Sequence, residues 1–407
     1  MVLSCLGAET TIVYLTSFIH RNALFNIAER WFCNCPEPGD CKSLTEILIC
    51  DGFVINETLA VLARRLLDMT HQRPFHQKRV RSKGELRDII SNDDQDAQPR
   101  VTELLRRYRE NPDYYYREAP INAVVCLDEQ NHLLGSFRIK RPKRIAEKAN
   151  RRIADWIYEK VLGRAQEMAE ERARLSGVPL DRLVTPSEEM MKEFILAEEF
   201  IAGSFRGRRN RFDRAASTIH DVGAIKIVAA SDELQQLEKA LMQTPDITVI
   251  ERADFSGKYQ ATKLILEVPW DSAYVCQRYR ECRAWERYLD RGIQEEYLKK
   301  GLEPFLVAAE PGMNIEVILT TFPDMVESEL GNSIHEERII AQRDNKNYRG
   351  YIPMNVEFLV ESLFAVGFSP RIDIDQVPIK LWGRYLPETL SSYVRQLHNL
   401  PEHDLTR

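Results

Sequence analysis

The feature that most constrains the fold is a strand–helix–strand pattern in the middle of this 407-residue chain. Residues 224–230 are an apolar run typical of a strand, residues 232–242 an amphipathic helix, and residues 247–251 a second strand. This is the minimum crossover unit of a mixed or parallel sheet. With a further strand expected over residues 259–268, the pattern predicts an α+β (α/β) fold built on a mixed β-sheet with helices.

Two acidic residues stand at or inside apolar strands. Asp221 precedes Gly223 at the start of one strand, and Glu316 lies inside the apolar run 314–322. A carboxylate buried in such a place is costly unless a cation binds it, so the pair predicts catalytic residues that hold Mg²⁺. Two alternatives stay open: Asp221 as a turn or cap residue, and Glu316 as a solvent-facing residue on a half-exposed strand.

Basic residues are concentrated in two segments, although the net charge is −6. Residues 138–152 contain eight basic residues and one acid, and residues 206–214 contain five arginines. Such patches attract phosphates, whereas the negative total charge argues against a general nucleic-acid binder, so no DNA partner is expected. The guanidinium fork suits bidentate phosphate contacts, and a basic helix face paired with acids is the alternative. The candidate nucleotide-binding arginines are Arg206, Arg208, Arg209 and Arg211.

Two further candidates for nucleotide binding lie on the expected strand over residues 259–268. Tyr259 and Lys263 share one face, because alternate residues of a strand point the same way. A ring and an amine side by side could stack a base and hold a phosphate. They fit a solvated face of the sheet equally well.

The order of these features resembles the synthetase domain of RelA/SpoT-type alarmone enzymes, which have a nucleotidyltransferase fold. That family carries R-x-K-S, then D-x-x-G-x-R-x-V, then G-Y-x-S-x-H, then E-x-Q-I-R-T followed by an acidic helix. The resemblance covers residues 204–336. The matching positions are Arg206 and Arg208 in the first motif, Asp221, Gly223 and Lys226 in the second, Tyr259 in the third and Glu316 in the fourth.

The third and fourth motifs depart from the family pattern. Lys258, Ala261 and Lys263 stand where the family has glycine, serine and histidine. Ile318 and Thr320 replace the glutamine and arginine of the fourth motif. These losses affect the recognition of an acceptor before they affect a metal site.

The first motif has a second match. Arg138 and Lys140 also fit R-x-K, with Lys148 following in the same basic segment. This placement requires a helical insertion before Asp221, so the spacing favours Arg206.

The resemblance implies Mg²⁺ held by Asp221 and Glu316 against ATP, with basic residues, among them Lys226, around its phosphates and Tyr259 stacked on the acceptor base. It further implies transfer of pyrophosphate from ATP to the 3′-hydroxyl of a guanine nucleotide, or here of another nucleotide or an RNA. Two alternatives remain. The chain is a non-catalytic nucleotide- or RNA-binding relative, or it is an unrelated α/β protein with an interaction role.

Four regions are expected along the chain. Residues 1–72 form a helical N-terminal region, residues 73–203 a linker, a β-hairpin and long helices, residues 204–345 the core, and residues 346–407 a helical extension. The polar stretch 70–97 is expected to be a linker with room for a short helix in its middle, and the hairpin joins residues 121–127 to residues 133–139.

The remaining expectations concern metal, membrane and compartment. A zinc site on Cys33, Cys35, Cys41 and Cys50 is possible, but their spacing lacks paired C-x-x-C units, which favours ordinary cysteines. No apolar run is long enough to cross a membrane, and no secretory signal is evident. The protein is therefore expected in the cytoplasm.

Overall fold

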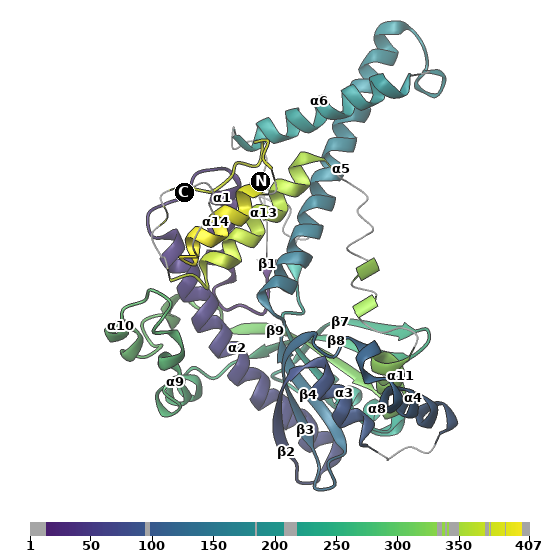
Figure 1. The fold of residues 1–407 in the computed structure, drawn as a ribbon, viewed down its shortest axis with the longest axis vertical. Helices are drawn as coiled ribbons and strands as arrows, with labels where there is room; N and C mark the ends of the chain where they lie inside the picture. The colour runs from purple at the N-terminus through teal and green to yellow at the C-terminus, as the bar shows by residue number, and fades with distance from the viewer. Residues whose placement is uncertain are drawn as a thin grey trace, which may run out of the picture.

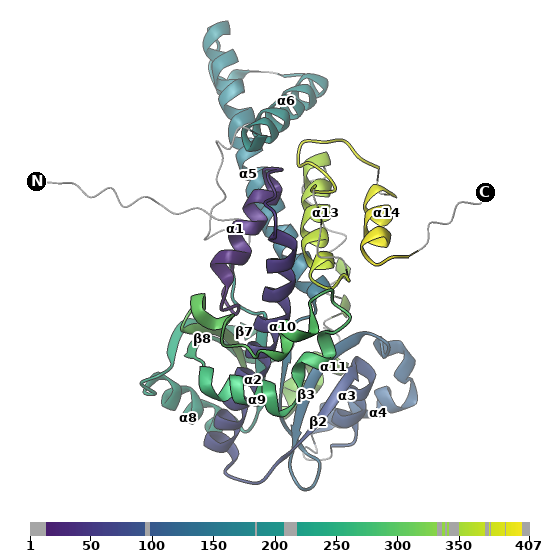
Figure 2. The same ribbon diagram turned by 90° about the vertical axis from the view of Figure 1, so that its left-hand side faces the viewer.

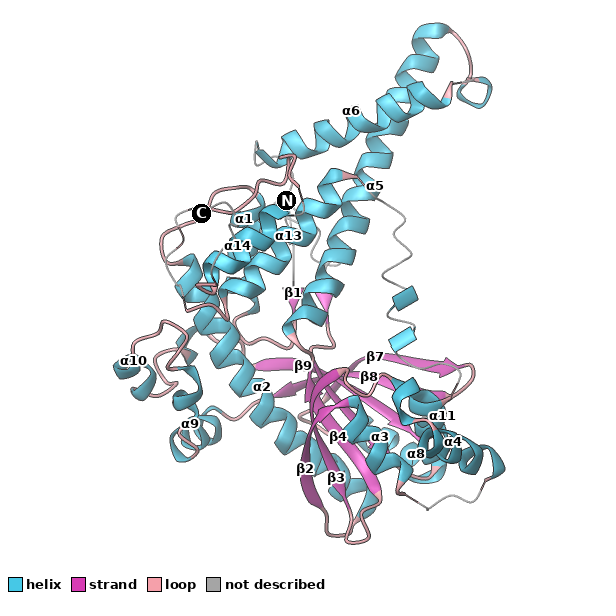
Figure 3. Ribbon diagram, in the orientation of Figure 1, coloured by secondary structure: helices cyan, strands magenta, loops and turns pink. Residues whose placement is uncertain are grey.

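The computed structural model has an α+β fold, as the sequence predicts (Figure 1). Strands gather in one part of the molecule, and helices fill the rest (Figure 3). No helix in the part of the chain that the structure describes is both long and apolar enough to cross a membrane. The described residues are 14–93, 98–183, 185–206, 218–331, 336–337, 340–341, 350–370, 374, 376–386 and 388–400.

One mixed sheet of seven strands forms the core of the fold. Strands β6 and β9 run parallel at its centre, and every other neighbouring pair is antiparallel. This confirms the predicted mixed sheet. In spatial order the strands are β2 (His76–Ser82), β3 (Pro120–Leu127), β4 (Leu133–Ile139), β6 (Gly223–Val228), β9 (Gly312–Thr320), β8 (Gln260–Pro269) and β7 (Thr248–Ser256).

Helix α2 (Asp40–His71) covers one face of the sheet, and α8 (Ser231–Met242) packs beside it. The approach is closest at Gly223, where an added Cβ would lie 3.2 Å from Ile55 and 3.4 Å from Leu59. Any larger side chain at the start of β6 would therefore push α2 away from the strand that follows Asp221.

A second, smaller core lies on the opposite face. Helices α3 (Lys83–Ser91), α4 (Pro99–Glu110) and α11 (Phe322–Leu330) pack there against β2, β3 and the end of β6. The prediction of a linker over residues 70–97 is therefore wrong for residues 76–82, which form the edge strand β2. The short helix allowed in this stretch is α3. The polarity of the stretch has a physical cause: β2 is an edge strand that exposes most of its side chains.

The remaining long helices form a separate layer above the sheet and the helices that pack on it (Figure 2). Helix α5 (Pro142–Ser176) rises from the end of β4, and α6 (Ser187–Arg206) folds back on its far part. Helix α13 (Tyr351–Val366) packs along α5 and α14 (Glu388–Leu397) along α13. The remaining elements are α1 (Arg21–Phe32), α9 (Ser272–Glu281), α10 (Glu295–Lys299) and the 3₁₀ turns Pro112–Tyr115, Leu180–Arg182, Ala284–Tyr288 and Leu306–Ala308.

A two-stranded parallel sheet ties the N-terminal region to the core. Strand β1 (Tyr14–Leu15) pairs with β5 (Thr218–Ile219), just ahead of Asp221. Strands from both sides of residue 204 also share the large sheet, while the four-region division itself stays a prediction.

Candidate functional site

Asp221 and Glu316 come from the two parallel strands at the centre of the sheet. Asp221 lies two residues before β6, and Glu316 is the fifth residue of β9. Cross-strand pairing places Ala224 opposite Glu316, so the side chains of Ala224 and Glu316 point to the face that α2 does not cover. The sequence separates the two acids by almost a hundred residues, and the parallel pairing brings them together.

Lys140 joins the two carboxylates. Its ammonium lies 2.5 Å from Oδ2 of Asp221 and 3.5 Å from Oε2 of Glu316. The two oxygens therefore cannot be farther apart than these two distances combined. The same ammonium also donates to the backbone carbonyl of Asp221 at 2.5 Å.

A second lysine contacts Asp221 from the first turns of α5. Lys148 forms an ion pair with the same carboxylate oxygen that Lys140 contacts. Burial alone would raise the pKa of Asp221, but the two ammonium groups outweigh it and hold that pKa well below its usual range. Asp221 is therefore an anion at any physiological pH.

The N-terminal segment fixes the backbone around Asp221. Thr16 donates through its backbone N–H to Ile219, and the Ser17 hydroxyl donates to the carbonyl of Asn314 at 2.7 Å. His220 completes this arrangement, with Nδ1 lying 3.0 Å from both Thr16 Oγ1 and Asn314 Nδ2. The segment thus holds the residue before Asp221 against the start of β9.

Lys226 shares the face of Glu316 but points deeper, beneath α11. Its ammonium lies 3.3 Å from Sδ of Met325. Burial lowers the pKa of Lys226 to about 8, with Glu329 acting in the opposite direction. Arg138 faces Ala224 across the β4–β6 ladder and so lies on the same side of the sheet.

Lys263 and Tyr259 are separated along β8. Lys263 pairs with Ile318, which places it on the face of Glu316, and its ammonium lies 2.7 Å from Glu251. Tyr259 lies in the turn before β8, near the end of β9 that is farther from Asp221. The structure thus brings Lys263 toward the two acids and leaves Tyr259 at the other end of the sheet.

Arg206 does not lie beside Asp221 in the described part of the chain. Arg206 ends α6, well away from the sheet, and its guanidinium stacks 5.0 Å from the ring centre of Trp382 (Figure 1). Arg208, Arg209 and Arg211 lie outside the described residues. The residues of the rival R-x-K match do lie at Asp221: Lys140 and Lys148 contact it, and α5 and α6 are the helical insertion which that match requires. The nucleotide-binding role of either basic segment stays a prediction.

Sequence reasoning missed a second set of charges on this face, the buried charge network. Lys83 and Arg87 of α3 contact Glu329 of α11 and Glu336, at distances from 2.7 to 3.6 Å. Arg87 has no exposed surface, and it also donates to the carbonyls of Glu329 and Tyr115. The signal available was modest: two basic residues four apart on one expected helix, and acids after β9.

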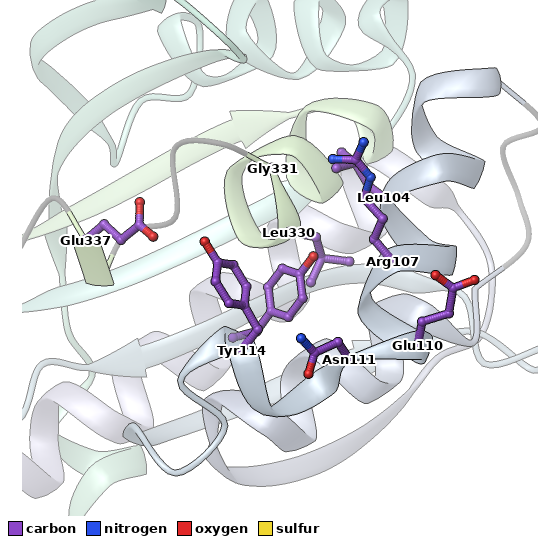
Figure 4. A pocket seen from close by; sticks show the side chains of 9 residues that line it. Leu104, Arg107, Glu110, Asn111, Tyr114, Leu330, Gly331 and Glu337 are labelled. Atoms are coloured by element: carbon purple, nitrogen blue, oxygen red, sulfur yellow. The ribbon is translucent and has the colours of Figure 1, made fainter.

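A cavity of about 460 Å³ opens beside this network (Figure 4). Polar and aromatic side chains from α4, the following turn and α11 line it, among them Arg107, Asn111 and Tyr114. None of the residues that line it is Asp221, Glu316 or a lysine that contacts them. The cavity is therefore separate from the site that the two acids define.

The donor set at the two acids fits Mg²⁺. This ion is commonly bound by one or two carboxylates, while water and substrate phosphates complete its octahedron. Lys140 occupies the space between the carboxylates, so a shared cation requires its flexible side chain to turn away. Within the described part of the chain no three His, Cys, Asp or Glu side chains are placed to hold a metal, which applies to Cys33, Cys35, Cys41 and Cys50 as well.

Comparisons with known proteins add little to this geometry. No protein family and no curated protein matches the chain. Among solved structures, the chain is similar to the small alarmone synthetase 1 from Bacillus subtilis, with 13% identity over 51% of this chain and 89% of that chain and a TM-score of 0.20. A TM-score this low carries no argument, so function has to be argued from the site.

Proposed function

We propose that the protein is a cytoplasmic, Mg²⁺-dependent nucleotidyltransferase or pyrophosphotransferase that uses ATP. The observation that supports this most is the acid pair: two carboxylates from neighbouring parallel strands share one ammonium on the face of the sheet that α2 does not cover. The order of its sequence motifs suggests pyrophosphate transfer to a nucleotide or RNA 3′-hydroxyl. A guanine nucleotide is the first acceptor to test.

Each side chain at the site has a task in this proposal. Asp221 and Glu316 hold the metal, which neutralises charge on the triphosphate when bound. Lys140 and Lys148, freed from the carboxylates, bind phosphate oxygens, and Lys263 extends the basic surface toward the acceptor. Catalysis of phosphoryl-type transfer rests largely on positioning and charge stabilisation, which this set supplies.

The first test is the binding of ATP, measured by isothermal titration calorimetry with Mg²⁺ and with EDTA. We expect Asp221→Asn and Glu316→Gln each to weaken Mg²⁺-dependent binding at least tenfold, which is about 1.4 kcal/mol. Asp254→Asn is the matched control, because Asp254 is an exposed acid of the same sheet that pairs with Arg252. Full affinity in both site variants would contradict the metal site.

The second test concerns the reaction. ATP labelled at its β-phosphate, which reaches an acceptor only in pyrophosphate transfer, is incubated with the protein and with GDP, GTP, AMP or tRNA as the acceptor. A product that carries the label identifies pyrophosphate transfer, and the acceptor that receives it identifies the substrate. If no acceptor gains label while ATP still binds, pyrophosphate transfer is refuted.

One observation favours a second candidate, a non-catalytic nucleotide- or RNA-binding protein. Lys140 and Lys148 together balance the charges of the two acids without a metal. This candidate predicts binding that EDTA leaves unchanged and that Asp221→Asn does not weaken. Lys148→Ala and Lys263→Ala would then lower the affinity instead.

A further inference from the structure

The α5–α6 arm projects away from the rest of the molecule (Figures 1 and 2). Helix α6 packs one side against α5 through Ala197, Ile201 and Phe205, which are 0%, 7% and 0% exposed. The Phe205 ring meets Trp156 edge-on at 6.2 Å between centroids. This contact covers one face of α6, and within the described part of the chain no other element packs extensively on this helix.

Lys192 and Glu199 occupy the midline of the opposite face of α6, and large apolar side chains flank them on both sides. Each of these apolar side chains is more than a third exposed. An isolated exposed apolar residue is ordinary, but four of them on one projecting helix mark a surface that another molecule covers. The four are Met191 (61% exposed), Ile195 (38%), Leu196 (53%) and Phe200 (56%).

Residues of the same kind, or of opposite charge, are placed symmetrically along this face about the point between Ile195 and Leu196. Met191 and Phe200 lie at equal distances from that point, and so do Lys192 and Glu199. Both charged residues are exposed. Apolar residues thus mirror apolar residues, and the one lysine mirrors the one glutamate.

We infer that this face of α6 is a homodimer interface, on which α6 of a second copy packs antiparallel. A twofold axis between Ile195 and Leu196 puts Lys192 opposite Glu199 of the second copy, and the symmetry forms this ion pair twice. Ile195 and Leu196 meet their own copies at the centre. Met191 lies level with Phe200 of the second copy, at each edge of the contact.

The charges select a second copy over a membrane. Amphipathic helices that lie on membranes carry lysine and arginine beside their apolar face. Here the face contains one lysine and one glutamate, and Glu188 and Glu189 are exposed at its N-terminal end. Arg164 and Arg384, which contact its edge, only balance these acids, so the face lacks the net positive charge that binds anionic lipid. An antiparallel copy, by contrast, satisfies both the lysine and the glutamate.

Two contacts within the chain touch this face without covering it. Glu199 lies 3.6 Å from Arg384, in a pair whose side chains are 51% and 73% exposed and therefore contribute little. Arg164 stacks 4.5 Å from the ring centre of Phe200, which stays half exposed. One helix pair is a small interface, so we expect a dissociation constant in the micromolar range.

A charge swap tests the pairing, with sedimentation equilibrium of the full chain as the measurement. Lys192→Glu and Glu199→Lys each place like charges opposite one another twice, and each should weaken dimerisation at least about tenfold. The double variant Lys192→Glu/Glu199→Lys restores opposite charges and should return the dissociation constant to nearly the wild-type value. Glu171→Lys, an equal charge change at an exposed position of α5, should have no effect.

Three results would overturn the inference. They are a monomeric wild type at high micromolar concentration, a dimer that tolerates either single swap, and single swaps that weaken the dimer without rescue by the double variant. Binding of the wild type to anionic vesicles in place of dimerisation would count against it too. Circular dichroism of each variant establishes that it is folded.

Discussion

Two groups of charges lie on the same face of the sheet and are made of the same components, two acids and two bases. In the buried charge network, side-chain exposure runs from 0% for Arg87 to 11% for Glu336. At the acid pair, it runs from 12% for Lys140 to 30% for Lys148. The first group is closed and connects helices, whereas the second is more exposed, and in the proposed function it exchanges a lysine for a ligand.

The types of residue in a charge cluster therefore do not distinguish a structural ion network from a binding site; the exposure of the side chains does. Removing one partner of a closed network leaves a buried charge without compensation, which is strongly destabilising. Removing one partner of a partly solvated cluster leaves charges that water can reach. Stability and ligand affinity should therefore respond in opposite ways in the two groups.

The largest expected effect is that of Glu329→Gln. It leaves Lys83 and Arg87 buried with too little negative charge, so we expect the free energy of unfolding to fall by about 3–5 kcal/mol. Urea denaturation measures the change. Glu327→Gln, on the same helix but paired with the exposed Arg100, should cost less than about 1 kcal/mol. Equal losses in the two variants would erase the contrast.

Acid should reveal the same network. Burial would raise the pKa of Glu329, but Lys83, Lys226 and Arg87 hold it well below its usual range. A carboxyl with a lowered folded pKa contributes stability above its unfolded pKa of about 4.3, and that stability is lost as the pH falls further. Between pH 6 and pH 3 the wild type should lose about 2 kcal/mol more than Glu329→Gln does. Parallel curves would show that Glu329 is not the titrating group.

Lys226→Met should stabilise the protein at pH 7 by about 1–2 kcal/mol, because the buried ammonium is costly to hold. Its folded pKa of about 8 lies below the ordinary value of 10.5. The cost is therefore complete below pH 8 and fades as the pH rises toward 10, where the folded state has lost the proton. Thermal unfolding at pH 7 and pH 10 measures this, and Lys239→Met on the exposed side of α8 is the control. A gain that persists at pH 10 would contradict the assignment.

Of the two groups, the acid pair should lose less stability: Asp221→Asn lowers the free energy of unfolding by about 1–2 kcal/mol, because its lowered pKa reflects ion pairs that are only partly buried. Lys140 keeps Glu316 as a partner, and Lys148 is open enough to be hydrated. The same variant should lose Mg²⁺-dependent ATP affinity, so the two measurements move independently. A loss of several kcal/mol by urea denaturation would place Asp221 with the buried charge network instead.

The elements of the fold were largely predictable because they depend on local patterns. The hairpin, the strand and helix after Asp221, and the strand that carries Glu316 lie within a few residues of their expected bounds. Strand β2 was missed because an edge strand with a polar exterior carries little apolar signal.

The site was predictable only in part, because its contacts join distant segments. The fold brings Asp221 and Glu316 together, yet the spacing favours Arg206 for the first motif, whereas Lys140 is the residue that contacts Asp221. Spacing along a chain cannot reveal that two long helices leave the sheet and return to it. The role of Thr16 and Ser17 beside Asn314 has no local signature either.

The pairing of β4 with β6 determines where the α5–α6 arm is attached to the sheet. The backbone N–H of Lys140 donates to the carbonyl of Val222 at 2.8 Å, so the chain departs and re-enters at adjoining points of one ladder. The excursion between them can lengthen or shorten without shifting any strand. Lys140 stands where the chain leaves the sheet and Asp221 where it returns, so a change in the orientation of the arm would act directly on the two residues of the proposed site.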